Sequence, residues 1–186
     1  MKKNLIALGL ALGLASANTL AATVGTGAIH FYGRIDSGTC PIEIIDPVTG
    51  NPESGNRVLM GNVDASLFNA SGDEAASRAF GMRITPGNGC TVNPGDAASV
   101  SFSGAFGGAG NGGTLFALEA GGAQNLALVL KDDTGTPIAH GATSKAYPLD
   151  AANPTTMLFS VAYKSTDRVV TAGAANTSMQ FVVDVP

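Results

Sequence analysis

The fold is indicated most directly by one stretch near the start of the chain, residues 23–35, which reads Thr-Val-Gly-Thr-Gly-Ala-Ile-His-Phe-Tyr-Gly-Arg-Ile. Successive side chains of a β-strand point to opposite faces, so alternation places every second residue on one side. One side is apolar and rich in glycine, and it carries Gly25, Gly27, Ile29, Phe31, Gly33 and Ile35. The stretch therefore predicts an unusually long strand that meets a surface with little room for side chains.

The rest of the chain consists of short apolar runs separated by glycine, asparagine, aspartate and proline. This pattern is typical of an all-β protein. The predicted strands cover 40–44, 57–63, 79–84, 100–102, 126–130, 157–163 and 180–186. We expect Phe80, Met82 and Ile84 to point inward, and we expect a glycine-rich loop over 104–113. Strands at this spacing predict one sandwich of about seven strands.

The first 22 residues differ from the rest and predict a cleaved secretory signal peptide. Lys2 and Lys3 are followed by the apolar run 5–14 and by the small residues 20–22. That order is typical of an export signal, and the run is shorter than the roughly 20 residues that span a bilayer. Loss of the two lysines leaves 8 basic and 14 acidic residues, a net charge of −6. An acidic chain without a basic cluster argues against nucleic acid as a partner.

Cys40 and Cys90 are the two cysteines of the chain. Export together with an even cysteine count predicts one disulfide between them. Such a bond closes a long loop, which the chain-entropy model values at roughly 4 kcal/mol. A zinc site is a poor alternative because the two histidines, His30 and His140, lack ligand spacing relative to the cysteines.

Three motifs resemble catalytic or cofactor sites, and each has a simpler interpretation. Asp133-Thr134-Gly135 matches one half of an aspartic protease dyad, but without a second copy it predicts a turn after a strand. The run 108–113 fits the dinucleotide fingerprint, but no long helix is predicted after it, so a surface loop is favoured. His30 and His140 belong to no recognisable triad. The sequence thus predicts no enzyme, no cofactor and no metal.

The two ends of the chain leave two interpretations open. A sandwich that lacks one strand exposes backbone at an edge, and an extended segment of another molecule can fill it. If each copy is both donor and acceptor, the contact is head-to-tail and builds a filament. Alternatively, both end segments are ordinary strands of one closed sandwich.

Several segments together resemble the type 1 fimbrial major-subunit (pilin) family of the chaperone–usher pathway. The similarity runs over nearly all of residues 23–186. It is carried by the order and spacing of segments 29–35 before Cys40, 58–63, 80–84 before Cys90, 132–135, 159–163, 173–176 and 181–183. One departure lies at the end, where Val185 and Pro186 stand in place of the penultimate tyrosine of the family.

The resemblance implies an incomplete immunoglobulin-like β-sandwich over 38–186 that lacks its last strand. Residues 23–37 would form an N-terminal donor-strand extension, with Gly33 as its glycine and with Ile29, Phe31 and Ile35 entering the groove of a neighbour. Phe181, Val183 and Val185 would line the chain's own groove and pair with a periplasmic chaperone. An outer-membrane usher would then export the subunit to a surface fimbria that supports adhesion. The alternative within the family is a minor adaptor or adhesin-type subunit.

Overall fold

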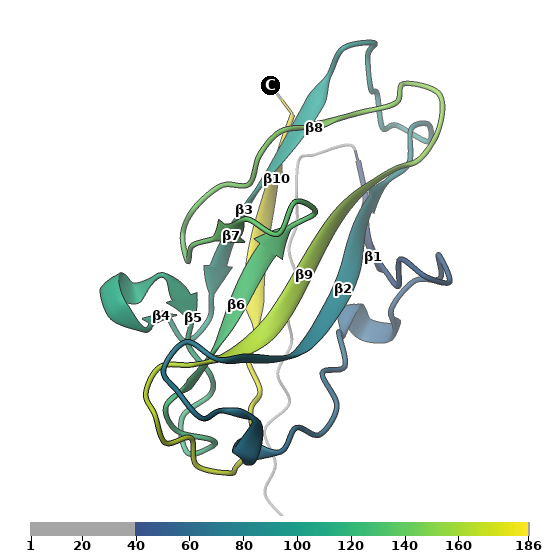
Figure 1. The fold of residues 1–186 in the computed structure, drawn as a ribbon. Helices are drawn as coiled ribbons and strands as arrows, with labels where there is room; N and C mark the ends of the chain where they lie inside the picture. Colours follow the sequence, from purple (N-terminus) through teal and green to yellow (C-terminus); the bar gives the residue numbers. More distant parts are fainter. Residues whose placement is uncertain (1–39, 186) are drawn as a thin grey trace, which may run out of the picture. The chain divides into compact units, whose positions relative to one another are not determined.

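The computed structural model describes residues 40–185, which form two antiparallel β-sheets (Figure 1). The larger sheet has the order β1-β2-β9-β6-β5-β4, with β7 paired to β6. Its strands are β1 Ile42–Ile45, β2 Glu74–Ile84, β4 Gly108–Ala109, β5 Leu115–Phe116, β6 Leu126–Asp132, β7 Pro137–Ile138 and β9 Thr155–Ser165. The smaller sheet has the order β10-β3-β8, formed by β3 Ala97–Gly104, β8 Tyr147–Pro148 and β10 Met179–Asp184.

Three short 3-10 helices lie in the connections, at η1 Ser54–Asn56, η2 Ala65–Leu67 and η3 Asn111–Gly113. The η2 turn begins at Asp64, whose carboxylate accepts the Ser66 backbone N–H at 2.9 Å. Residues 40–185 contain no helix long and apolar enough to span a membrane.

The long strands form because their apolar side chains alternate. In β2, Phe80, Met82 and Ile84 are buried as predicted, with at most 5% of each side chain exposed. Their partners in β9 are Phe159, Met157 and Thr155. Strand β6 lies between β9 and β5 and is buried over most of its length, as expected for a central strand.

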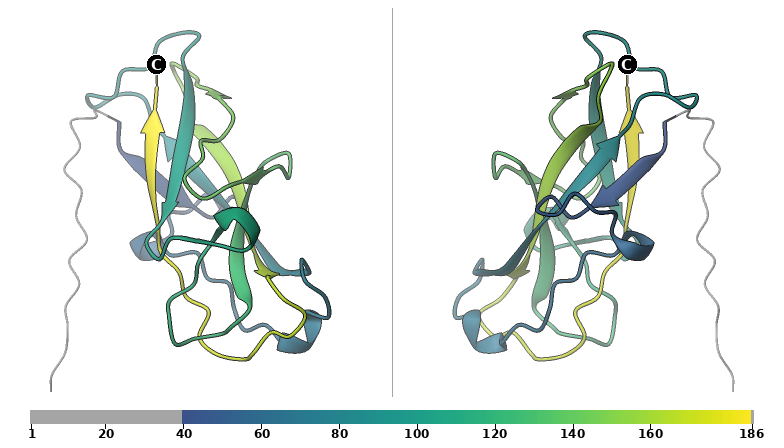
Figure 2. Two further views of the ribbon diagram at one scale, coloured as in Figure 1. Left: turned by 90° about the vertical axis from the view of Figure 1, so that its left-hand side faces the viewer. Right: turned by 90° about the vertical axis from the view of Figure 1, so that its right-hand side faces the viewer.

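The core fills the space between the two sheets, which face each other (Figure 2). Its centre is an aromatic group around Phe159 of β9. The Phe102 ring of β3 lies 5.2 Å from the Phe159 ring, the Tyr147 ring of β8 lies 5.4 Å away, and Phe80 stacks at 5.6 Å. Edge-to-face and stacked pairs at such distances add to the stabilisation from burial alone. Residues from both sheets therefore belong to one core.

The disulfide joins Cys40, just before β1, to Cys90, beyond the end of β2. It ties together the same two strands that pair through Ile42 opposite Ile84. The predicted disulfide is therefore present in the structure, with a sequence separation of 50.

Two predictions about local structure are wrong. The glycine-rich run 104–113 is no plain loop, because it contains β4 and η3 and pairs with β5. Its glycines allow close packing, because a Cβ on Gly108 would clash with the Gly113 carbonyl oxygen. The segment 57–63 was predicted as a strand, but it pairs with no strand among residues 40–185. The strand count is also higher than the predicted seven, because several short strands carry little apolar pattern.

The predicted signal peptide, residues 1–22, lies outside the described residues. The predicted donor strand, residues 23–37, also lies outside them, together with His30 and the six donor-face positions.

Candidate strand-acceptor site

Strand β10 forms one border of the core. It pairs with β3 in continuous antiparallel register, from Met179 opposite Gly104 to Asp184 opposite Ser99. Alternate residues Met179, Phe181 and Val183 are half-buried and pack against the core, while Val182 on the opposite face is 41% exposed. Within the described part of the chain, β10 is the end strand of the smaller sheet.

Of the three residues predicted to line the groove, two face the core and one does not. Phe181 and Val183 lie on the inner side of β10. Val185 follows the strand and is 42% exposed. Met179 shares the inner face and was missed, although the same alternation extended by two residues would have included it.

The segment 57–63 forms a second border of the core. Val58, Met60 and Val63 are half-buried and pack against the core, whereas Leu59 is 74% exposed. The residue at its start, Arg57, has extended backbone angles of φ −105° and ψ 122°. Around Leu59 the side chains therefore alternate as they would in a strand, and the alternation ends at Gly61, whose φ is 74°.

The backbone of the same segment lacks the partners that a strand normally has. Among residues 40–185, no backbone–backbone hydrogen bond involves any residue of 57–63. One polar contact reaches it, from Arg78 Nε of β2 to the Leu59 carbonyl oxygen at 3.1 Å. An apolar inner face combined with unpaired backbone groups is the arrangement to which an extended peptide can add by β-augmentation.

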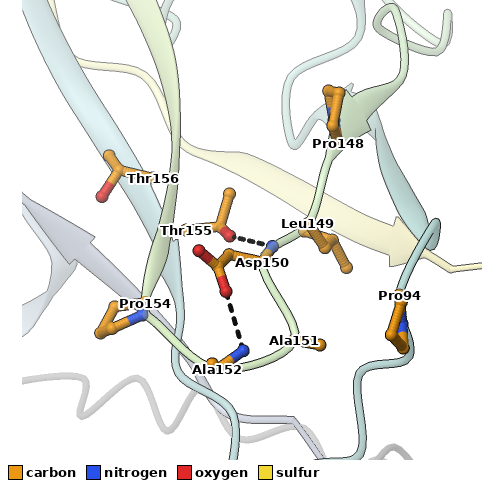
Figure 3. A pocket seen from close by; sticks show the side chains of 9 residues that line it. All are labelled: Pro94, Pro148, Leu149, Asp150, Ala151, Ala152, Pro154, Thr155 and Thr156. Atoms are coloured by element: carbon orange, nitrogen blue, oxygen red, sulfur yellow. Dashed lines mark hydrogen bonds between the residues drawn. The ribbon is translucent and has the colours of Figure 1, made fainter.

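A shallow hollow lies at another edge of the sandwich (Figure 3). It is lined by Pro94, Pro148, Leu149, Asp150, Ala151, Ala152, Pro154, Thr155 and Thr156. The carboxylate of Asp150 accepts the backbone N–H groups of Ala152 at 2.8 Å and Asn153 at 3.0 Å. These hydrogen bonds, the Ala152 one foremost, lower the pKa of Asp150. Because the carboxylate is occupied in stabilising its own turn, the hollow offers no obvious chemistry.

The Asp133-Thr134-Gly135 motif forms the turn between β6 and β7, as predicted. The buried carboxylate of Asp132 organises this turn: its Oδ1 accepts the Thr134 hydroxyl at 2.6 Å, the Thr134 N–H at 2.9 Å and the Thr136 N–H at 2.9 Å. The Thr134 hydroxyl is the main cause of the lowered pKa of Asp132.

His140 packs edge-on against Phe116, with ring centroids 5.6 Å apart. Across the described residues, no group of three His, Cys, Asp or Glu side chains is placed to hold a metal ion.

Two facing antiparallel sheets around one core, with a disulfide at the start of the first strand, define the protein as an immunoglobulin-like β-sandwich of the chaperone–usher pilin type. The model of the family described as fimbrial protein matches residues 29–186. The chain therefore belongs to the fimbrial protein family.

Relatives of known sequence and structure agree with this assignment. Long polar fimbria protein A of Salmonella typhimurium is 28% identical over 183 residues, which cover 97% of this chain and 95% of that protein. The crystal structure of an antigen and type I fimbria protein of Burkholderia pseudomallei is 28% identical, with a TM-score of 0.58, over 78% of this chain and 99% of that one. A chaperone–usher pilus structure shares the fold at 16% identity and a TM-score of 0.61, over 88% of this chain and 97% of that one.

Proposed function

We propose that this chain is a structural subunit of a bacterial surface fimbria and polymerises by donor-strand complementation. The observation that carries the proposal is the segment 57–63, which has an apolar inner face but no backbone partner within the described part of its own chain. Membership of the fimbrial protein family and the likeness to pilus subunits support it.

In this proposal, residues 23–37 of the neighbouring subunit supply the missing strand. Their alternate residues Ile29, Phe31 and Ile35 would add apolar surface to the half-buried side chains of β10 and of segment 57–63. Backbone hydrogen bonds would provide affinity, and the alternating side chains would fix the register. Because the donor and acceptor are different surfaces, the contact does not close and each addition extends a filament.

Before assembly, a periplasmic chaperone would occupy the same site and an outer-membrane usher would receive the subunit. The proposed route thus runs from the signal peptide, residues 1–22, through the periplasm to the cell surface. In this role the chain has no catalytic function.

The test compares two neighbouring positions of β10. Val183 faces the core and Val182 faces outward. Cells expressing the chain with its chaperone and usher are examined by electron microscopy for surface fibres. Val183→Lys places a charge where the incoming strand must pack, so we expect fibres to be lost; Val182→Lys is the matched control and should keep them.

A third variant lacks residues 23–36 and removes the proposed donor. Fibres from this deletion would exclude the N-terminal strand as the donor, and fibres from Val183→Lys would exclude β10 as part of the acceptor. Periplasmic disulfide-bonded protein, measured for each variant, separates an assembly defect from a failure to fold. Fibres from none of the variants, wild type included, would instead favour an adaptor or adhesin-type subunit added to another protein's filament.

A further inference from the structure

Arg78 occupies an unusual position for a charged residue. Strand alternation places it on the same face of β2 as Phe80, and it lies opposite Val161, a core residue of β9 that is 4% exposed. Arg78 is nevertheless exposed. An exposed arginine has a guanidinium that can reach a neighbouring segment.

The local backbone of β2 helps to set this position. The register with β9 shifts between Ala75 and Arg78, which is a β-bulge, and Ala76 within it has a positive φ of 56°. Bulges add one residue to a strand and re-aim the side chains that follow. The strained conformation of a non-glycine residue at this point indicates that the surrounding structure maintains the bulge.

The contact that Arg78 makes falls on the segment that lacks backbone partners. Its Nε donates to the Leu59 carbonyl oxygen at 3.1 Å. Among the described residues, this is the one hydrogen bond that links 57–63 to the rest of the protein. The half-buried Val58 and Met60 on either side of Leu59 hold the same segment through apolar contact.

We infer that Arg78 is a positioning residue for strand addition, which holds segment 57–63 beside β2 so that its backbone is ordered before a neighbour's strand arrives. The inference rests on the proposed function and names a residue that acts within it. Ordering a binding edge in advance lowers the conformational cost of association and so raises affinity. Arg78 needs no contact with the incoming strand to have this effect.

The test uses Arg78→Met, which keeps the length of the apolar stem and removes the donor, and Arg78→Lys, which keeps a cationic donor. Arg83→Met is the matched control. Arg83 lies on the same strand and also donates to a backbone carbonyl, that of Gly50 at 3.0 Å, but it contacts a different loop and also forms an ion pair with Glu43 of β1. The variants are made in the full chain as it is exported and purified.

Two measurements are made on each variant. Hydrogen exchange of residues 57–63 reports whether the segment is held, and titration with a labelled peptide of residues 23–37 reports the dissociation constant. Loss of one hydrogen bond of ordinary strength predicts that Arg78→Met weakens peptide binding by about three- to tenfold. We also expect faster exchange in 57–63, partial recovery in Arg78→Lys, and wild-type behaviour of Arg83→Met in both measurements.

The outcomes separate the inference from the proposed function. Unchanged exchange of 57–63 in Arg78→Met, or an equal loss of affinity in Arg83→Met, would overturn the role of Arg78. A peptide that fails to bind the wild-type chain would overturn strand addition, and with it the reason for a positioning residue. A fall in thermal stability without a change in exchange or affinity would make Arg78 a merely structural residue and would equally reject the inference.

Discussion

Gly81 of β2 offers a sharp test of how the larger sheet packs. It pairs with Ile45 of β1 on one side and with Leu158 of β9 on the other. A Cβ added at this position would lie 2.7 Å from Cγ2 of Thr156 and 2.8 Å from Cγ1 of Ile45. Real Cβ atoms do not approach other atoms so closely, so Gly81→Ala requires at least one of the two side chains to move.

Two opposing effects determine the sign of the change in stability. Replacing glycine by alanine at an unstrained position stabilises by about 0.4–1 kcal/mol, because the unfolded chain loses freedom. Adding a carbon to a closely packed site costs about 1–3 kcal/mol. Ile45 is 4% exposed and has little room to move, so the packing cost should dominate. We expect Gly81→Ala to lower the free energy of unfolding by about 1–2 kcal/mol.

The assay is urea unfolding of the wild type, Gly81→Ala, Thr156→Ser and the double variant. Thr156→Ser removes the nearest carbon, so the cost of Gly81→Ala should shrink in that background, by about 0.5–1.5 kcal/mol. An unfolding midpoint for Gly81→Ala equal to or above that of the wild type would refute the reasoning. An undiminished cost in the Thr156→Ser background would show that Thr156 is not the obstacle.

Two further predictions concern single residues. Ala76→Gly should raise the free energy of unfolding by about 0.5–1 kcal/mol in thermal denaturation, because glycine adopts the positive φ of 56° without the left-handed strain of alanine; a lower melting temperature would contradict this. Asp132→Asn should make the free energy of unfolding fall less steeply as the pH is lowered into the acid range. The lowered pKa of Asp132 means that its contribution is present above the ordinary value of 3.8 and is lost as pH falls through the folded-state value. Urea unfolding midpoints measured from neutral pH downward check this. Midpoints that fall equally steeply with pH in the wild type and in Asp132→Asn would reject it.

Local alternation in the sequence was sufficient to predict the inner faces of the long strands. Phe80, Met82 and Ile84 point inward because a strand with one buried face must place every second side chain in the core. The Asp133-Thr134-Gly135 turn was equally local, because its hydrogen bonds run to Asp132, one residue before it.

The sequence alone could not predict features that depend on contacts with residues far away along the chain. Val58 and Met60 alternate with Leu59 as in a strand, but alternation does not reveal whether the backbone has a neighbour to pair with. The contact of Arg78 with Leu59 comes directly after a bulge at Ala76, and nothing in an alanine-rich run signals a positive φ. The glycine-rich run predicts a loop, but glycine is equally compatible with the close approach of backbone segments that the structure shows.

The bond between Cys40 and Cys90 has a consequence for how the protein responds to mechanical load. A chain pulled from its two ends transmits force across the disulfide, which bypasses the 50 peptide steps between the two cysteines. At about 3.3–3.6 Å per residue, roughly 165–180 Å of contour length is thereby withheld from stretching. Strands β1 and β2 both lie inside this covalent loop, so tension on the start of the chain cannot peel them apart one pair at a time. The part that can yield begins after Cys90, with the smaller sheet and the strands that follow it.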